Sequence, residues 1–368
     1  MHHNSDPTNL RIAGPTPLPP EVITALQRPM IPHRGEAFRA LFRQLLARLR
    51  PMHGTDDVFV LPGTGSAGWE IAIVNTLQPG DAVLAVVAGD FGERWARVAS
   101  RYGLVVHRVD VPWGQPATAA VVQSGLAAHP EVRAVLYTYN ETSTGVANPL
   151  REVAAIVRQH GALLLVDAVS AVAGMPLEMD AWGVDLAFSG SQKAWMCPPG
   201  LVIVGVGPRV WEAASRAGFP RAFWDLEEYR AQARQGDMPS TAPLSLIYAL
   251  DAAVSLIEQE GLEHVYARHA RLAALFRDGA RKVGYRLFAD PAYASPTVTA
   301  LVPPDGISAD DVVRTLRERF GIEINDGQGK LKGHIVRVGH MGWVHEPELQ
   351  RTIEALSAVA RLQQTRLS

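Results

Sequence analysis

The sequence is organised around one stretch, Phe188-Ser189-Gly190-Ser191-Gln192-Lys193-Ala194-Trp195. Its lysine is the only one before Lys282, and only Lys330 and Lys332 follow, so arginine supplies nearly all of the positive charge. Lysine differs from arginine because it loses its proton and forms a Schiff base with a carbonyl group. Residue type alone favours a surface or packing role for Lys193, and the surrounding sequence favours a chemical one.

Composition and charge exclude several classes of protein. The chain has 368 residues, 47% of them hydrophobic, which is enough for about two domains with a large core. The formal net charge is −2, so no basic excess indicates nucleic acid binding. The single cysteine, Cys197, excludes a disulfide framework and a cysteine-rich metal cluster. The first residues lack the features of a signal peptide and no apolar run could span a bilayer, so we expect a soluble cytoplasmic protein.

Apolar strands alternate with helices through most of the first 206 residues. After short and longer helices at 21–26 and 38–50, the second of which Pro51 is expected to stop, the predicted strands are 58–61, 82–87, 105–109, 132–139, 162–166, 186–188 and 201–206. The predicted helices between them are 69–77, 93–102, 121–128 and 153–160. This pattern indicates an α/β protein with a mostly parallel sheet covered on both faces, whose chemistry lies at the strand C-termini.

The two ends of the chain differ from this pattern. Residues 1–20 are rich in proline and form an extended arm with no core of its own. From about Leu244, long helices at 244–260 and 263–283 precede short strands near 297–302 and 335–338 and helices at 309–320 and 346–362. We therefore predict an N-terminal arm over 1–18, a large domain over 19–258 and a small α+β domain over 259–368.

A glycine-rich stretch, Gly63-Thr64-Gly65-Ser66-Ala67-Gly68, follows a strand and opens a helix. Small residues at this place let backbone N–H groups approach a phosphate, which the helix dipole also favours. The string also fits the dinucleotide-binding pattern, with Asp90 at the expected distance of about 20 residues. An NAD-dependent oxidoreductase is therefore an alternative, although it gives the lone lysine no role. A tight strand-to-helix turn without a ligand is another.

An acidic residue, Asp167, ends the apolar strand before the lysine stretch. A carboxylate at such a place is costly unless it has a partner, and it could hold a proton on a heteroaromatic nitrogen, cap a helix or bind a cation. The chain thus orders a phosphate cup, a strand-end aspartate and a loop lysine. Pyridoxal phosphate offers a phosphate, a pyridine nitrogen and an aldehyde, which are the three matching groups.

From Gly14-Pro15-Thr16-Pro17 to about Trp343, the chain resembles the class V aminotransferases of the fold type I pyridoxal-phosphate enzymes. Within them it is most similar to the alanine–glyoxylate, serine–glyoxylate and serine–pyruvate group. The resemblance implies a large cofactor-binding domain with a mostly parallel seven-stranded sheet, a small α+β domain, and a homodimer whose active sites are shared across the interface.

The resemblance also implies roles for individual residues. Lys193 would form the Schiff base and act as general base, and Asp167 would keep the ring nitrogen protonated. The ring would lie between Phe91, where many members have tryptophan, and Val169. Thr142, in Asn140-Glu141-Thr142-Ser143-Thr144-Gly145, would reach the ring hydroxyl and the substrate side.

The remaining roles concern phosphate and substrate. The phosphate would be contacted by Thr64, Gly65, Ser66 and Gln192, and by Thr241 of the neighbouring subunit. The substrate carboxylate would bind Arg337, with the arm near Gly14 beside it. Two residues depart from the family pattern, because Met238 stands where a tyrosine is frequent and Ser66 where a histidine is frequent.

The expected activity is transfer of an amino group from alanine or serine to glyoxylate or pyruvate in two half-reactions. The run Val338-Gly339-His340-Met341-Gly342 also resembles pyridoxamine–pyruvate aminotransferases, which is the alternative on the same fold. No metal is expected, since His264 and His269 lie five residues apart on a helix and do not share a face.

Overall fold

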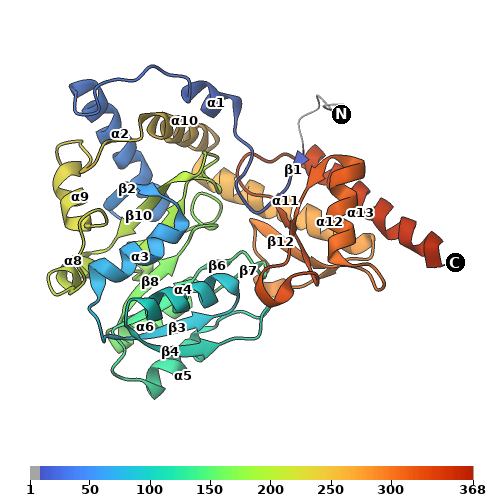
Figure 1. Ribbon diagram of the computed structural model, residues 1–368, viewed down its shortest axis with the longest axis horizontal. Coiled ribbons are helices and arrows are strands. Elements are labelled where there is room, and N and C mark those ends of the chain that lie inside the picture. The colour runs from blue at the N-terminus through green and yellow to red at the C-terminus, as the bar shows by residue number, and fades with distance from the viewer. Residues whose placement is uncertain (1–8, 368) are drawn as a thin grey trace.

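The structure, a computed structural model, describes residues 9–367 and the side chains of residues 9–361. Its larger part is built on a seven-stranded sheet with the strand order β2-β10-β9-β8-β5-β3-β4 (Figure 1). The strands are β2 (Asp57–Gly63), β3 (Ala82–Val87), β4 (Val105–Asp110), β5 (Ala134–Thr138), β8 (Leu163–Asp167), β9 (Leu186–Gly190) and β10 (Gly200–Val206). Strand β10 runs opposite to the other six strands, and the remaining pairs in this sheet are parallel. The mostly parallel α/β sheet is therefore confirmed.

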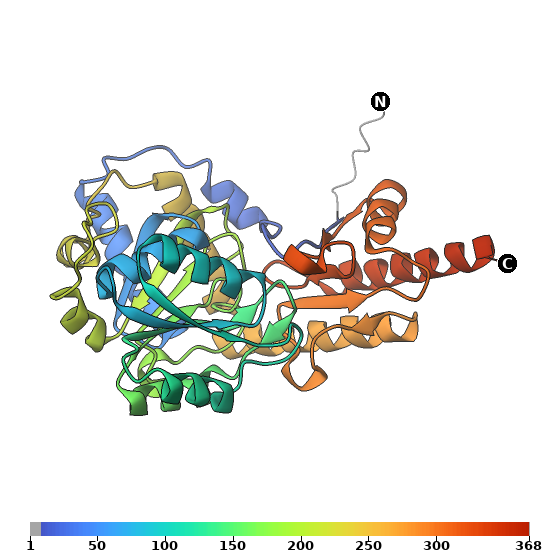
Figure 2. The same ribbon diagram turned by 60° about the horizontal axis from the view of Figure 1, so that its bottom comes forward.

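Helices cover both faces of the large sheet (Figure 2). The helices α3 (Gly65–Thr76) and α4 (Asp90–Arg101) pack on one face, and α5 (Ala119–Ala128) and α6 (Leu150–His160) pack on the other. Burial from both sides explains why β3, β5 and β8 are buried along their whole length. The edge at β2 is covered by α2 (Glu36–His53) and α9 (Leu226–Ala233), with α10 (Leu244–Glu260) against α2 and α1 (Pro20–Ala25) against α10. Two short helices, α7 (Met179–Trp182) and α8 (Pro208–Ala214), complete this part.

Several expected helix ends are wrong, and α4 and α6 each begin three residues earlier than predicted. Helix α2 continues through Pro51 to His53, because a proline in the last turn removes one hydrogen bond without breaking the turns before it. The helix ends at Gly54, whose left-handed backbone (φ 64°) returns its N–H to the Arg50 carbonyl. Helix α3 begins at Gly65 rather than Trp69, so the glycine-rich stretch forms its first turn.

The smaller part has its own sheet and core. Strands β11 (Arg286–Leu287), β12 (Val298–Val302), β15 (Val336–Gly339) and β14 (Asn325–Asp326) pair antiparallel in that order. Helices α11 (Leu262–Lys282) and α12 (Ala309–Phe320) pack on this sheet, and α13 (Glu346–Leu367) packs against both of them. A separate cluster of buried side chains, including Phe276, Leu316 and Leu356, forms the core of this α+β part. The domain limits proposed from the sequence stay a prediction.

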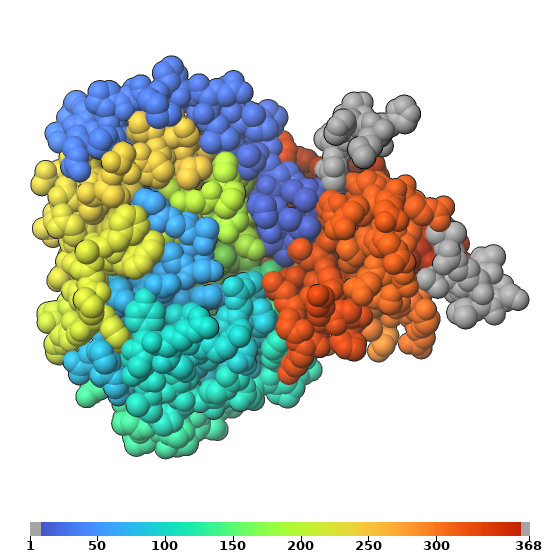
Figure 3. Space-filling model, viewed as in Figure 1, coloured from blue at the N-terminus to red at the C-terminus, as the bar shows by residue number. Residues whose placement is uncertain are grey.

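The N-terminal arm joins the two parts. Strand β1 (Asn9–Leu10) pairs parallel with β13 (Ile322–Glu323) of the smaller part. The Arg11 carbonyl then accepts the Gly339 N–H at 2.7 Å, and the Thr16 hydroxyl donates to the Lys193 carbonyl at 2.9 Å. In Figure 3 the dark blue segment of the arm fills the space between the two parts. From Asn9 on the arm is extended, as expected, and its packing brings Gly14 to the lysine, whereas the first eight residues of the predicted arm lie outside the described residues.

Among the described residues, no helix is long and apolar enough to cross a membrane.

Candidate active site

Lys193 lies in the turn between the antiparallel strands β9 and β10, where its N–H donates to the Gly190 carbonyl at 3.2 Å. Its amine donates a hydrogen bond to the Ala13 carbonyl of the arm. A Cβ added to Gly14 would lie 2.7–2.9 Å from the end of the lysine side chain, and the positive φ of 109° at this residue favours glycine. Burial, together with the nearby charge of Arg337, lowers the pKa of Lys193 to about 8. The amine therefore loses its proton far more readily than an exposed lysine.

Asp167 is the last residue of β8, the strand beside β9. Its carboxylate accepts hydrogen bonds from the Trp69 indole N–H at 2.8 Å and from the Val169 N–H at 3.0 Å. Burial raises the pKa of Asp167 to about 6, although both hydrogen bonds and the charge of Lys193 favour the ionised form. The carboxylate is thus largely charged at pH 7 and lies on the strand end nearest the lysine turn.

The predicted phosphate cup lies at the start of α3. Thr64 at the N-cap is exposed and makes no side-chain cap, so the first N–H groups of the helix keep their capacity for an anion. A Cβ on Gly65 would lie 2.5 Å from Val169, and one on Gly190 would lie 3.4 Å from the Gly65 nitrogen. The cup therefore touches both the segment after Asp167 and the lysine turn. Beside it, the buried Gln192 Oε1 has no hydrogen-bond partner.

Arg337 on β15 reaches the site from the smaller part. Its guanidinium donates to the Asp326 carbonyl at 3.0 Å, to Gln328 Oε1 at 3.0 Å and to the Thr142 carbonyl at 3.4 Å. Burial lowers the pKa of Arg337 to about 10. All three acceptors are neutral, and no carboxylate forms a salt bridge with Arg337 in the part of the chain that the structure describes. Its charge therefore stays available to a carboxylate ligand.

The remaining predicted residues fall into two groups. Thr142 is buried, and its hydroxyl lies 2.7 Å from that of Ser170. Phe91 is half-buried in the first turn of α4, and its ring centre lies 6.5 Å from that of Trp69. These two flank the Asp167 strand end. Ser66 and Thr241 are exposed instead. Thr241 lies in the segment between α9 and α10, where Met238 is buried, and it makes no contact with the lysine site that the structure records.

One residue that the sequence analysis missed is Glu141, which is fully buried. Its carboxylate accepts hydrogen bonds from the backbone N–H groups of Phe91 at 3.4 Å, Gly92 at 3.2 Å and Ser143 at 3.1 Å, and from the Ser143 hydroxyl. Burial raises the pKa of Glu141 to about 7. The partners in α4 precede it by 50 residues, so no local pattern shows the contact. Gly89, which precedes that helix, has no side chain and so leaves space for the Glu141 carboxylate.

These residues fit pyridoxal phosphate. The uncapped start of α3 suits the phosphate, Asp167 suits a protonated ring nitrogen, and the lysine amine with its lowered pKa suits the aldehyde. The assignment of each residue stays a prediction, and the geometry brings most of them to one edge of the large sheet.

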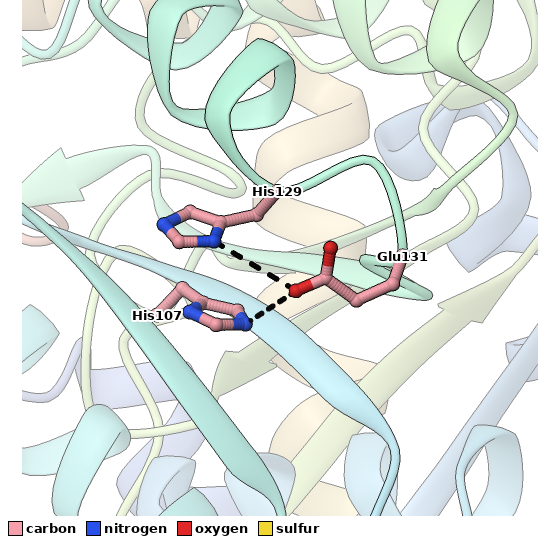
Figure 4. A group of neighbouring side chains, drawn as sticks. All are labelled: His107, His129 and Glu131. Atoms are coloured by element: carbon pink, nitrogen blue, oxygen red, sulfur yellow. Dashed lines mark ion pairs between the residues drawn. The ribbon is translucent and has the colours of Figure 1, made fainter.

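A second group of titratable residues lies away from this edge, on β4 and after α5 (Figure 4). Glu131 Oε1 is 2.7 Å from His107 Nε2 and 3.7 Å from His129 Nδ1. The two imidazole rings stack with centres 3.6 Å apart and planes 16° apart. Because ring-nitrogen lone pairs lie in the ring plane, stacked rings direct them along parallel lines rather than towards one ion. The group is a shared carboxylate–imidazole contact and not a preformed metal site.

Comparison with known proteins gives one consistent family. The model of the family described as aminotransferase class-V matches residues 8–341. The L-aspartate–glyoxylate aminotransferase of Paracoccus denitrificans is 40% identical over 90% of this chain and 85% of its own. The crystal structure of an alanine–glyoxylate aminotransferase from Nostoc sp. superposes with a TM-score of 0.92 at 34% identity, over 98% of this chain and 97% of its own.

A further relative has a different kind of name. A protein of a Synechococcus strain named as the small subunit of a soluble hydrogenase is 38% identical over 96% of this chain and 93% of its own. This chain has one cysteine, Cys197, which is buried. One thiolate does not supply the set of four that holds an iron–sulfur cluster.

Proposed function

The chain belongs to the class V aminotransferases, which are pyridoxal-phosphate enzymes, and we propose that it transfers the amino group of alanine or serine to glyoxylate or pyruvate. The observation that carries the proposal is the convergence of the Lys193 amine, the Asp167 carboxylate and the unpaired Arg337 guanidinium. A small substrate suits the crowding beside the amine, where the backbone of Gly14 packs against the lysine side chain. Membership of the family sets aside the NAD-dependent oxidoreductase.

Each residue has a definite task in the proposed reaction. Arg337 binds the substrate carboxylate with its planar fork, which fixes the substrate relative to the lysine. Asp167 keeps a proton on the ring nitrogen, and the bound cofactor then acts as an electron sink for the substrate Cα. Lys193 Nζ would take the proton from the substrate Cα and hold it for its return within the same half-reaction. The second half-reaction runs the same proton steps in reverse with the 2-oxo acid.

A single lysine variant tests the chemistry. Reduction of the wild-type holoenzyme with borohydride is expected to leave a pyridoxyl group on Lys193, detected by peptide mass spectrometry. Lys193→Ala should lose this modification. Its transaminase activity should fall by at least about three orders of magnitude, since both the base and the covalent attachment are removed. Lys282→Ala, at an exposed position ending α11, is the control and should keep both. A pyridoxyl group on another lysine of the wild type would refute the assignment.

A donor screen tests the substrate. Alanine, serine, aspartate and pyridoxamine are each assayed with glyoxylate and with pyruvate. Alanine or serine should give the highest kcat/KM, whereas a preference for pyridoxamine would favour the alternative activity on the same fold. A preference for aspartate would contradict the proposed small neutral donor. The cytoplasmic location stays a prediction.

A further inference from the structure

The first turn of α4 takes its hydrogen-bond acceptors from another segment of the chain. The N–H groups of Phe91 and Gly92 donate to the two carboxylate oxygens of Glu141 at 3.4 and 3.2 Å, and the Asp90 N–H donates to Ser143 Oγ at 2.9 Å. The helix itself has no side-chain cap at Gly89. Helix starts need such acceptors, and here they come from loop 140–145, which comprises β6 (Asn140–Glu141) and the turn that leads to β7 (Val146–Ala147).

The same loop also holds the substrate side of the site. The Thr142 carbonyl accepts from Arg337 at 3.4 Å, and the Thr142 hydroxyl lies 2.7 Å from that of Ser170, three residues after Asp167. The Asn140 amide donates to the hydroxyl of Ser170 at 2.7 Å. Loop 140–145 thus joins the helix that carries Phe91 to the arginine expected to bind substrate.

We propose that Glu141 is a positioning residue: its carboxylate holds Phe91 in register with Thr142 and Arg337, and so sets where the cofactor ring and the substrate carboxylate lie. The inference rests on the proposed function, because it assigns the ring-stacking role to Phe91. It adds a residue that contacts neither ligand and acts through the two elements it joins.

A carboxylate is the group that this position requires. Backbone N–H donors from two segments and a hydroxyl converge on its two oxygens, which only accept hydrogen bonds. A glutamine amide would turn an NH2 group against some of these donors. The positive end of α4 and the charge of Arg337 favour the ionised form, whereas burial and the charge of Asp167 oppose it and give Glu141 its raised pKa.

Glycine before the helix is part of the same arrangement. A Cβ on Gly89 would lie 2.4 Å from the Cγ and Cδ atoms of Glu141 and 2.5 Å from Ser143 Oγ. The backbone of Gly89 is extended, so a side chain there is excluded by contact and not by conformation. Gly89→Ala should therefore displace the carboxylate without altering its chemistry, which gives a second and independent variant.

The test compares Glu141→Gln and Gly89→Ala with a matched control, Asp185→Asn. Asp185 is also a buried carboxylate that accepts a backbone hydrogen bond, from Leu164 at 2.7 Å. It directly precedes β9 and therefore lies at the opposite end of the strands from Asp167. The Kd of pyridoxal phosphate is measured by titration of each full-length apoenzyme. The visible circular dichroism of the bound cofactor reports the orientation of its ring, and the Tm of each apoenzyme reports stability.

We expect Glu141→Gln and Gly89→Ala to raise the cofactor Kd about tenfold, which is about 1.4 kcal/mol, and to reduce the visible circular dichroism. Asp185→Asn should lower the Tm comparably and leave the Kd and the circular dichroism unchanged. The inference fails if Glu141→Gln keeps both cofactor signals within twofold of wild type, or if Asp185→Asn alters them equally. Wild-type cofactor binding without transamination of alanine or serine would instead contradict the proposed substrates and leave this comparison intact.

Discussion

The hydrogen bonds of Arg337 go to neutral acceptors, which suits the proposed binding of a substrate carboxylate. Its guanidinium is positioned by two carbonyls and an amide oxygen, so its orientation is fixed without a direct salt bridge to a carboxylate of the described residues. Lysine would keep a positive charge but lose the planar fork that matches a carboxylate in bidentate fashion. A lysine at position 337 would therefore test the geometry of the guanidinium while keeping the positive charge.

Arg337→Lys is therefore expected to raise the KM for the amino donor at least about tenfold with a smaller change in kcat, because binding of substrate and transition state is weakened alike. Steady-state kinetics with alanine and glyoxylate provides the measurement. Arg286→Lys, at an exposed position on β11, is the control and should leave both constants unchanged. An unchanged KM in Arg337→Lys would show that the substrate carboxylate binds elsewhere.

Residues whose role depends on chain order were predictable, and those that depend on distant packing were not. Asp167 and Lys193 end or follow consecutive strands of the sequence, and parallel topology places such strand ends at one edge. Arg337 was proposed only through the family resemblance. Its partners are Thr142, Asp326 and Gln328, and Thr142 lies 195 residues earlier in the chain, so no local pattern shows the contact. Glu141 escaped notice because its two helix N–H donors lie in a different supersecondary unit.

At the scale of elements, the contact of α3 with β9 depends on one glycine. A Cβ on Gly68 would lie 2.1 Å from the ring of Phe188, which is itself buried and packs edge-on against Trp95 with ring centres 5.4 Å apart. The ring has no space to retreat into, so the helix must move outward if the glycine is replaced.

Gly68→Ala is expected to lower the free energy of unfolding by about 1–3 kcal/mol, through overpacking. Phe188→Leu removes part of the ring, so the double variant should cost less than the sum of the two single changes by about 0.5 kcal/mol or more. Urea denaturation of all four proteins of the cycle gives these values. Additive costs would mean that the helix and the strand do not meet through this pair.

Helix α11 is coupled to the lysine turn through a neutral histidine. His269 Nδ1 donates to the Val265 carbonyl at 2.7 Å, and Nε2 accepts the Gly342 N–H at 2.9 Å, next to the Lys193 carbonyl. Burial lowers the pKa of His269 to about 4. Between pH 6.5 and 4 the unfolded chain therefore binds more protons at this residue, and the stability that it contributes is lost as the pH falls.

Replacing this histidine should make the protein less sensitive to acid. From pH 6.5 to pH 5 one such group changes stability by about 2 kcal/mol, so His269→Gln should lose less stability over that interval than wild type by about that amount. Urea denaturation at both pH values gives the difference. His334→Gln, at an exposed position, is the control and should keep the wild-type slope. Equal slopes in wild type and His269→Gln would mean that His269 titrates normally.

Element types were predictable further than their ends. Continuous apolar runs between turn residues identified the sheet strands, because burial on both faces leaves no alternation to misinterpret. The N-terminus of α3 was missed since glycine-rich sequence usually indicates a turn, and here the small side chains serve close packing against Val169 and Phe188. Strand β1 has two residues and gains its structure only from β13, so no local signal could show it.

At the scale of the whole molecule, one face around the start of α10 remains uncovered. Ile23 and Met30 are exposed at 47% and 63%, and the segment between them is fixed to α10 by the Tyr248 hydroxyl, which donates to the Pro29 carbonyl at 3.3 Å. Thr241 is exposed just before the same helix. These exposed apolar side chains, and a threonine that has no hydrogen-bond partner among the described residues, favour the predicted homodimer.

The prediction is a particle of twice the 39.9 kDa of one chain, measured by light scattering after size exclusion. Met30→Arg should weaken the dimer, because it places a charge in the apolar contact. The activity per chain of the Met30→Arg variant should fall on dilution, since Thr241 would then be withdrawn from the phosphate site of the other subunit. Val105→Arg changes an exposed apolar residue on β4, at the opposite edge of the sheet, and should leave the dimer intact. A wild-type monomer with full activity at nanomolar concentration would show that each chain completes its own site, and Thr241 would then need another explanation.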